Sequence, residues 1–274
     1  MNTAHGAAPA RIVKVQGGLG NQLFCLAMAH SVARVTGESV GLDVASYRAD
    51  RYGQGFELAP LAKDLGLAIT PAGLIGTRAG AWLARRLGGR GVVGDGATPQ
   101  GEKALRALAM RGRAFVGYWQ DEAWIADAPA FADAARRLIA ARAPAAPATD
   151  LAVHWRSYAE EVRPSRRATP DEAYFRAAYE RVVAARGAPG DILLVSDRPD
   201  LARGRIGSAF TPTDGRAADK WADLAAVIAA RALILTNSSF SWWGGFLSQA
   251  SPILWPRRGG LFHYPAPAER FEVV

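Results

Sequence analysis

The stretch that decides the fold of the second half of the chain is Leu233-Ile-Leu-Thr-Asn-Ser-Ser-Phe-Ser-Trp-Trp-Gly244. Apolar residues typical of a buried strand stop at small polar residues, and an apolar run of helical length follows. Such a turn leaves backbone N–H groups unpaired at a helix N-terminus, where the helix dipole favours an anion. The alternative is an ordinary helix cap made by the serines. Because Trp242 and Trp243 are large and apolar, we expect them to pack the turn against a core or a ligand wall.

Strand and helix patterns alternate regularly after residue 150. Apolar runs predict the strands, and longer runs with helical spacing predict the helices. Consecutive strands joined by helices form a parallel sheet with crossover connections, so this half is predicted to be a doubly wound domain. The predicted strands are 151–154, 191–197 and 232–235, and the predicted helices are 169–186 and 220–230.

A proline-containing stretch separates this domain from the rest of the chain. An amphipathic helix is predicted over 131–142, and residues 143–149 then place two prolines among small residues, which is the clearest linker in the sequence. We therefore predict an N-terminal lobe over 11–143 and a C-terminal lobe over 144–274. Residues 1–10 are predicted to be a disordered tail.

A glycine-rich turn follows the first predicted strand, Arg11–Gln16. It reads Gly17-Gly-Leu-Gly-Asn-Gln22, and apolar residues at helical spacing come after it. The glycines permit positive φ angles and a close approach to a ligand, and Asn21 or Gln22 offers an amide at the helix start. The spacing differs from the dinucleotide fingerprint and no P-loop lysine follows, so tight packing alone is the alternative.

The order of strands and helices in the remainder of the N-terminal half is harder to predict from sequence. A second strand is predicted over 40–43, and the stretch through residue 113 alternates helical segments with glycine-rich breaks. Residues 115–124 interleave aromatic and polar side chains, which is typical either of a strand end that lines a cleft or of a packed edge. Core packing is favoured here over contact with a sugar.

Composition bounds the class of protein. The chain has 274 residues, half of them hydrophobic, which is enough for one large core or two modest ones. The net charge of +8 suits an anionic partner, but the scattered arginines are not interleaved with aromatics, which disfavours a nucleic-acid-binding protein. The single cysteine, Cys25, excludes an internal disulfide and is predicted to be a small buried residue. Without a signal-peptide pattern or a membrane-spanning run, the sequence predicts a cytoplasmic protein.

Polar side chains follow three predicted strands of the C-terminal lobe. His154 and Arg156 close the first strand, Asp197 closes the second, and residues 237–241 close the third. Ligands of parallel sheets bind at this edge. An arginine fork and serine donors match a diphosphate, and Asp223 would accept hydrogen bonds from the edge of a base. Taken singly, the histidine is as typical of a structural residue, and the arginine of a surface ion pair.

Together these motifs resemble the α-1,2-fucosyltransferases, glycosyltransferase family 11. The similarity runs from residue 11 to about residue 256 and keeps the order of the family's motifs. The turn at 237–244 is its most specific element. The similar segments are Gly17–Gln22, Gly117–Gln120, Val153–Arg156, Ser196–Asp197, Asp223–Leu224 and Asn237–Gly244.

The resemblance implies an α/β fold of the GT-B type, in which two Rossmann-like lobes carry parallel sheets and the C-terminal lobe binds the nucleotide. It implies inverting transfer of fucose from GDP-fucose, without a metal or another cofactor, to the 2-hydroxyl of galactose in a glycan or lipid-linked oligosaccharide. Arg156, on the β-phosphate, and Asn21, approaching the diphosphate and fucose from the other lobe, would be catalytic. His154 and Asp223 would recognise guanosine. The further donor-binding candidates are Gly18, Gly20, Asn237, Ser238, Ser239 and Phe240, and the acceptor-side candidates are Tyr118, Trp119, Gln120 and Glu160.

One segment departs from the family pattern. Where the family has two consecutive arginines followed by Gly-Asp-Tyr, this chain reads Arg156-Ser-Tyr-Ala-Glu160. The missing arginine removes a charge-assisted contact to the diphosphate worth about 1.5–3 kcal/mol, unless Arg163, Arg166 or Arg167 replaces it. The alternatives are therefore a glycosyltransferase of the same fold with another sugar nucleotide or linkage, and a catalytically silent nucleotide- or glycan-binding relative.

Two further assignments stay open at this stage. The general base is one of four acids, none of which the sequence ranks above the others. The positive charge also predicts peripheral contact with an anionic membrane surface, where a lipid-linked acceptor would lie. No Asp-x-Asp pair or histidine spacing predicts a metal site. The candidate bases are Asp121, Glu122, Glu160 and Glu161.

Overall fold

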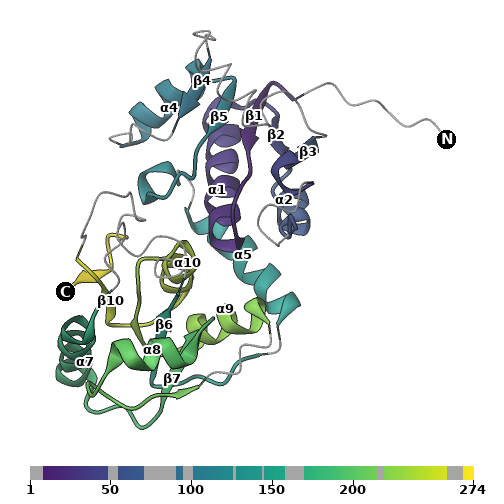
Figure 1. Ribbon diagram of the computed structural model, residues 1–274. Helices are drawn as coiled ribbons and strands as arrows, with labels where there is room; N and C mark the ends of the chain where they lie inside the picture. The colour runs from purple at the N-terminus through teal and green to yellow at the C-terminus, as the bar shows by residue number, and fades with distance from the viewer. Residues whose placement is uncertain are drawn as a thin grey trace. The chain divides into compact units, whose positions relative to one another are not determined.

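The computed structural model divides into two compact units, Met1–Ala135 and Arg136–Val274, which are described separately below (Figure 1). The division falls inside helix α5 (Ala128–Arg142), whereas the sequence places the boundary after residue 143. Of the predicted tail, residues 1–8 lie outside the described part of the chain. The structure describes residues 9–48, 55–70, 91–94, 101–125, 128–143, 145–157, 170–214, 219–257 and 268–274.

The first unit is built on a parallel sheet. Its strands follow the order β3-β2-β1-β5-β4, so the order reverses between β1 and β5. The strand predicted over 40–43 is confirmed, and the first strand is two residues shorter than predicted. The strands are β1 (Arg11–Lys14), β2 (Val40–Asp43), β3 (Ala68–Thr70), β4 (Val92–Gly94) and β5 (Ala114–Val116).

Helix α1 (Leu19–Thr36) lies against this sheet and forms much of the core of the first unit (Figure 1). Most of its residues are buried, and Cys25 is fully buried without a disulfide, as predicted. The helix ends at Gly37, whose φ of 69° is the left-handed conformation that glycine adopts most easily. The other helical segments here are α2 (Ala59–Asp64), α4 (Gly101–Arg111), and the short η1 (Ala45–Tyr47) and η3 (Glu122–Trp124).

The second unit contains a six-stranded parallel sheet in the order β11-β10-β9-β6-β7-β8. Counted along this unit alone, that is the 3-2-1-4-5-6 order of a Rossmann sheet, read from β8 to β11. The order reverses between β6 and β9. The strands are β6 (Leu151–Trp155), β7 (Ile192–Ser196), β8 (Thr213–Asp214), β9 (Ala232–Ile234), β10 (Ile253–Trp255) and β11 (Glu272–Val273).

The helices of the second unit follow the sequence prediction closely. The helix predicted over 169–186 begins at Glu172, where the Asp171 side chain accepts from the Tyr174 N–H and so caps it. The α/β class, with a parallel sheet in each of two Rossmann-like units, is confirmed. Among the described residues no helix is both long and apolar enough to cross a membrane. The helices are α7 (Glu172–Arg186), α8 (Pro199–Ile206), α9 (Lys220–Ala229) and α10 (Ser239–Leu247).

The tandem tryptophans pack helix α10 into the core, as expected. Trp242 and Trp243 are both fully buried, and the Trp242 ring stacks on Phe246 with the centroids 4.7 Å apart. Helix α10 also packs on α9, and Gly244 makes this close approach feasible. A Cβ at Gly244 would lie 2.5 Å from Cγ1 of Val227 in α9. The glycine therefore sets the distance between the two helices.

We expect Gly244→Ala to lower the free energy of unfolding by about 1–3 kcal/mol, because the added methyl forces α9 and α10 apart in a packed core. Gly204→Ala, in helix α8, is the matched control, since nothing lies within 4 Å of its Cβ position. That change should raise stability by up to about 1 kcal/mol through helix propensity. Urea unfolding of both variants measures the two effects. A free energy of unfolding for Gly244→Ala equal to that of the wild type would contradict the packing argument.

Candidate functional site

The candidate site of the second unit lies where the strand order reverses. Strands β6 and β9 are neighbours here, and the strands that follow them in sequence, β7 and β10, lie on opposite sides of this pair. In open parallel sheets this switch point is where ligands bind. Arg156 follows β6, and Asn237 and Ser238 follow β9, so the topology brings these predicted residues to one edge of the sheet.

The turn after β9 presents the N-terminus of α10. Ser238 is the N-cap, and its Oγ accepts from the Phe240 N–H at 3.2 Å. The Ser238 hydroxyl hydrogen can still be donated, and Ser239 begins the helix without an acidic residue in the first turn. Asn237 Oδ1 is buried and has no hydrogen-bond partner among the described residues. The turn therefore combines donors for an anion with one unused acceptor.

Arg156 is held beside this turn by an acidic partner. Its Nε lies 3.6 Å from Oδ2 of Asp197, which follows β7. The Ser157 backbone N–H and hydroxyl both donate to the same carboxylate, at 2.9 and 3.0 Å. The Arg156 side chain is 42% exposed, so the guanidinium keeps donors for a ligand while Asp197 limits its rotamers.

Ser157 occupies the position where the family resemblance expects a second arginine. It is only 1% exposed, and its short side chain reaches Asp197 from within the fold. A long charged side chain would lose both this hydrogen bond and the burial. The departure in sequence thus corresponds to a local structure in which Arg156 is the one arginine directly after β6. Arg163, Arg166 and Arg167, the possible substitutes, lie outside the described residues.

His154 lies inside the fold and connects β6 to the turn. Its Nδ1 is hydrogen-bonded to Ser241 Oγ, and its ring stacks on Phe240 at 5.0 Å between centroids. The His154 carbonyl accepts from the Thr236 hydroxyl at 3.0 Å. Burial lowers the pKa of His154 to about 3, and the positive charge of Arg156 acts in the same direction. The imidazole is therefore neutral and shapes the start of α10.

Asp223 enters the site from helix α9, which packs on both β6 and α10. The pKa of Asp223 is raised to about 6, chiefly by burial and also by the nearby Asp219 carboxylate, while the Arg156 guanidinium opposes the rise. Arg156 thus acts electrostatically on both His154 and Asp223. The result is a group made of a partly exposed cation paired with Asp197, a carboxylate of raised pKa and a neutral imidazole.

The first unit brings together a second set of predicted residues. Gln120, which follows β5, donates from Nε2 to Oδ1 of Asn21 in α1 at 2.7 Å. Tyr118 is exposed, whereas Trp119 is fully buried, as core packing predicted. Of the three glycines in the turn only Gly17 has a positive φ, while Gly18 is the N-cap of α1 and Gly20 lies in the helix.

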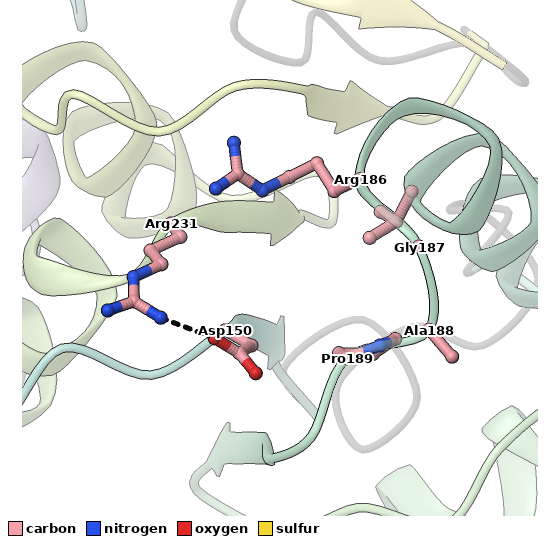
Figure 2. Close-up of a pocket in the computed structure, with 7 residues that line it drawn as sticks. Asp150, Arg186, Gly187, Ala188, Pro189 and Arg231 are labelled. Carbon is pink, nitrogen blue, oxygen red and sulfur yellow. Dashed lines mark hydrogen bonds and ion pairs between the residues drawn. The ribbon is translucent and has the colours of Figure 1, made fainter.

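A pocket of about 280 Å³ opens at the opposite, amino edge of the second sheet (Figure 2). Its charges are already paired, since Arg231 Nη1 lies 2.7 Å from Asp150 Oδ1 and the Gly190 N–H donates to the same carboxylate at 2.8 Å. Arg186 likewise donates to the Ser251 carbonyl. None of the predicted site residues lines this pocket. The lining residues are Asp150, Val182, Arg186, Gly187, Ala188, Pro189 and Arg231.

The structure adds two residues that sequence reasoning did not single out. Ser157 fixes Asp197, and Asp219 acts on Asp223. Neither has a motif of its own, and only the register of β6 beside β7 brings Ser157 to Asp197. Glu160, an acceptor-side and base candidate, lies outside the described residues. Within the described part of the chain, no cluster of three or more histidine, cysteine, aspartate or glutamate residues has the arrangement of a metal site.

Comparisons with known proteins do not assign the chain to a family. No protein-family model matches it, and no curated protein matches it by sequence. Among solved structures it is similar to a glycosyl transferase family 9 protein of Veillonella parvula, with 11% identity, a TM-score of 0.44, and coverage of 97% of this chain and 86% of that one. It is also similar to the fucosyltransferase NodZ from Bradyrhizobium, with 14% identity, a TM-score of 0.43, and coverage of 88% of this chain and 93% of that one. With the ADP-heptose LPS heptosyltransferase II of E. coli it shares 11% identity and a TM-score of 0.43, with coverage of 96% of this chain and 89% of that one.

We expect His154 to make the second unit sensitive to acid. The pKa of His154 is about 3 in the folded protein and 6.5 in the unfolded chain. Between these pH values, His154 binds a proton in the unfolded chain but not in the folded protein. Stability from the neutral imidazole is complete above pH 6.5 and is lost as the pH falls towards 3. The stability difference between wild type and His154→Phe, which keeps a ring on Phe240 but cannot titrate, should shift by about 2–3 kcal/mol between pH 6.5 and 4.5. Parallel pH profiles in urea unfolding would show that His154 is protonated in the fold.

Proposed function

We propose that the chain is a GT-B glycosyltransferase that transfers fucose from GDP-fucose to a hydroxyl of a glycan, with inversion and without a metal. The observation that carries the proposal is the convergence of Arg156, the N-terminus of α10 and Asp223 at the switch point of the second sheet. The two Rossmann-like units are the parts that a GT-B enzyme requires. The family resemblance supplies the identity of the sugar nucleotide.

The diphosphate fits the donors at this edge. A guanidinium forms charge-assisted hydrogen bonds with phosphate oxygens, and the free N–H groups of a helix N-terminus add to the attraction of an anion. In the proposal, Arg156 contacts the β-phosphate, and the hydroxyl groups of Ser238 and Ser239 contact the diphosphate, whereas the Phe240 N–H is used within the turn. Because Ser238 Oγ already accepts from Phe240, its hydroxyl contributes as a donor.

Guanine fits the carboxylate of Asp223, a hydrogen-bond acceptor on α9. A carboxylate matches the adjacent N–H groups on one edge of this base, so Asp223 in its ionised form would accept two hydrogen bonds. His154, buried and neutral, supports the same region by orienting Phe240 and Ser241. The unpartnered Oδ1 of Asn237 offers a further acceptor for a hydroxyl of the sugar nucleotide.

Transfer proceeds by displacement at the anomeric carbon. The acceptor oxygen forms the new bond to that carbon, the bond to the β-phosphate oxygen breaks, and its electron pair leaves with GDP. The acceptor proton passes to a carboxylate base. Arg156 and the α10 donors stabilise the charge that develops on the leaving phosphate, which lowers the barrier directly.

The acceptor side is proposed to lie in the first unit. Tyr118 and Gln120 are its candidates, with Tyr118 exposed and able to stack on a sugar ring, whereas Trp119, also predicted there, is fully buried and packs in the core. Asp121, one of the candidate bases, caps the short helix η3, since its Oδ1 accepts from the Ala123 N–H. Galactose in a glycan or a lipid-linked oligosaccharide is the proposed acceptor. The net charge of +8 suits an approach to an anionic membrane surface.

We expect GDP to bind the wild-type protein and to bind Arg156→Ala at least tenfold more weakly, because hydrogen bonds to charged groups contribute about 1.5–3 kcal/mol. Calorimetric titration measures both affinities. Arg231→Ala is the matched control, since it removes the same charge and the same type of ion pair at the opposite edge (Figure 2). Equal GDP affinity of the two variants, or no binding by wild type, would remove the site from the switch point.

A mass-spectrometric screen of sugar nucleotides against galactosides then tests the transfer itself, in buffer with EDTA. Fucosylated product from GDP-fucose is expected, with its turnover reduced strongly in Arg156→Ala. Transfer of another sugar alone would move the assignment to a different donor. GDP binding without transfer to any acceptor would identify a silent relative, and transfer that stops with EDTA would contradict the metal-free mechanism.

The raised pKa of Asp223 predicts how GDP binding depends on pH. Since the ionised carboxylate accepts from guanine and the free pKa is about 6, lowering the pH from 7.5 to 5 should weaken GDP binding by about tenfold. Asp223→Asn should bind weakly throughout and show only the titration of the phosphate itself. Asp219→Asn should move the midpoint to lower pH, because it removes a like charge. Identical profiles for all three proteins would exclude Asp223 from base recognition.

A further inference from the structure

Two segments nearly a hundred residues apart meet through one pair of amide side chains in the first unit. Asn21 stands at the start of α1, directly after the turn that follows β1, and Gln120 follows β5. Strands β1 and β5 are neighbours, and the strand order of this sheet reverses between them. The hydrogen bond from Gln120 Nε2 to Asn21 Oδ1 therefore spans the switch point of this unit, where ligands of such sheets bind.

Unusual backbone conformations hold both amides in place. Gly17 has a φ of 83°, and a Cβ there would lie 2.5 Å from Nδ2 of Asn21, so a glycine is needed for the Asn21 side chain to occupy this space. Trp119, directly before Gln120, has a φ of 56°, which is rare for a bulky residue. Its buried ring packs edge-on against Trp124 at 5.0 Å and so fixes this conformation. Backbone strain of this kind is typical of functional sites.

The hydrogen bond decides which end of the Asn21 amide is available. Gln120 donates to the carbonyl oxygen, so the Asn21 amide cannot turn over without losing this bond. The Asn21 NH₂ group is left as a donor, and no described residue accepts from it. Half-buried and at the switch point, it is a donor of fixed direction.

We propose that Gln120 is a positioning residue, which locks the Asn21 amide so that its NH₂ group donates to an oxygen of the substrate bound at this switch point during transfer. The inference rests on the proposed function and assigns Gln120 a role other than direct contact with the acceptor. A donor fixed before the reaction stabilises developing charge without reorganising, so its effect appears in kcat rather than in KM.

The test compares two substitutions at Gln120 by steady-state kinetics with GDP-fucose. Gln120→Glu keeps the shape but replaces the NH₂ donor with an acceptor, which turns the Asn21 amide and points its carbonyl oxygen at the substrate. Gln120→Ala removes the donor and leaves the amide free. We expect kcat to fall about tenfold in Gln120→Glu and about threefold in Gln120→Ala. A purely structural role would give the opposite order, because alanine removes far more packing than glutamate.

The double variants complete the test. In an Asn21→Ala background, which itself should lower kcat by about a hundredfold, both changes at Gln120 should have less than a twofold further effect. Gln249→Glu, the same change at an exposed site in the second unit, serves as the control for charge. Independent, multiplicative losses, or a larger loss for alanine than for glutamate, would overturn the positioning role while leaving the proposed function intact. A wild-type protein that neither binds GDP nor transfers fucose would overturn both.

Discussion

The reversal of strand order between β6 and β9 is the constraint on which the candidate site depends. Both strands are buried along their length, and the exposed polar residues of the site, such as Arg156, come after the strands end. Because the two strands are parallel and adjacent, these ends meet at one edge. Because β6 continues to β7 and β9 to β10, on opposite sides of this pair, Arg156 and the N-terminus of α10 lie at the switch point of the sheet.

The pKa values of the titratable groups at this edge depend more on burial than on ion pairs. Desolvation is the largest influence on both His154 and Asp223, and it favours the neutral form of each. Arg156 opposes this effect at Asp223 and reinforces it at His154. The site therefore combines a partly exposed cation with a neutral imidazole and a carboxylate of raised pKa.

The two units solve the same structural problem with different side chains. Each places a turn at its switch point, and each uses a glycine where a methyl group would not fit, Gly17 beside Asn21 and Gly244 beside Val227. The first unit orients a neutral amide through Gln120, whereas the second orients a guanidinium through Asp197. In both cases the orienting partner comes from the neighbouring strand of the sheet.

Local pattern in the sequence determined strands β6, β7 and β9 and helices α7, α9 and α10 of the second unit, the burial of Trp242 and Trp243, and the polar strand ends where the candidate residues lie. These features depend on the period of apolar residues and on turn chemistry, which neighbouring residues carry by themselves. The tertiary structure alone decided that Ser157 holds Asp197 and that Gln120 holds Asn21. Such contacts depend on strand order and register, which are set by packing between distant segments, and no local pattern encodes them.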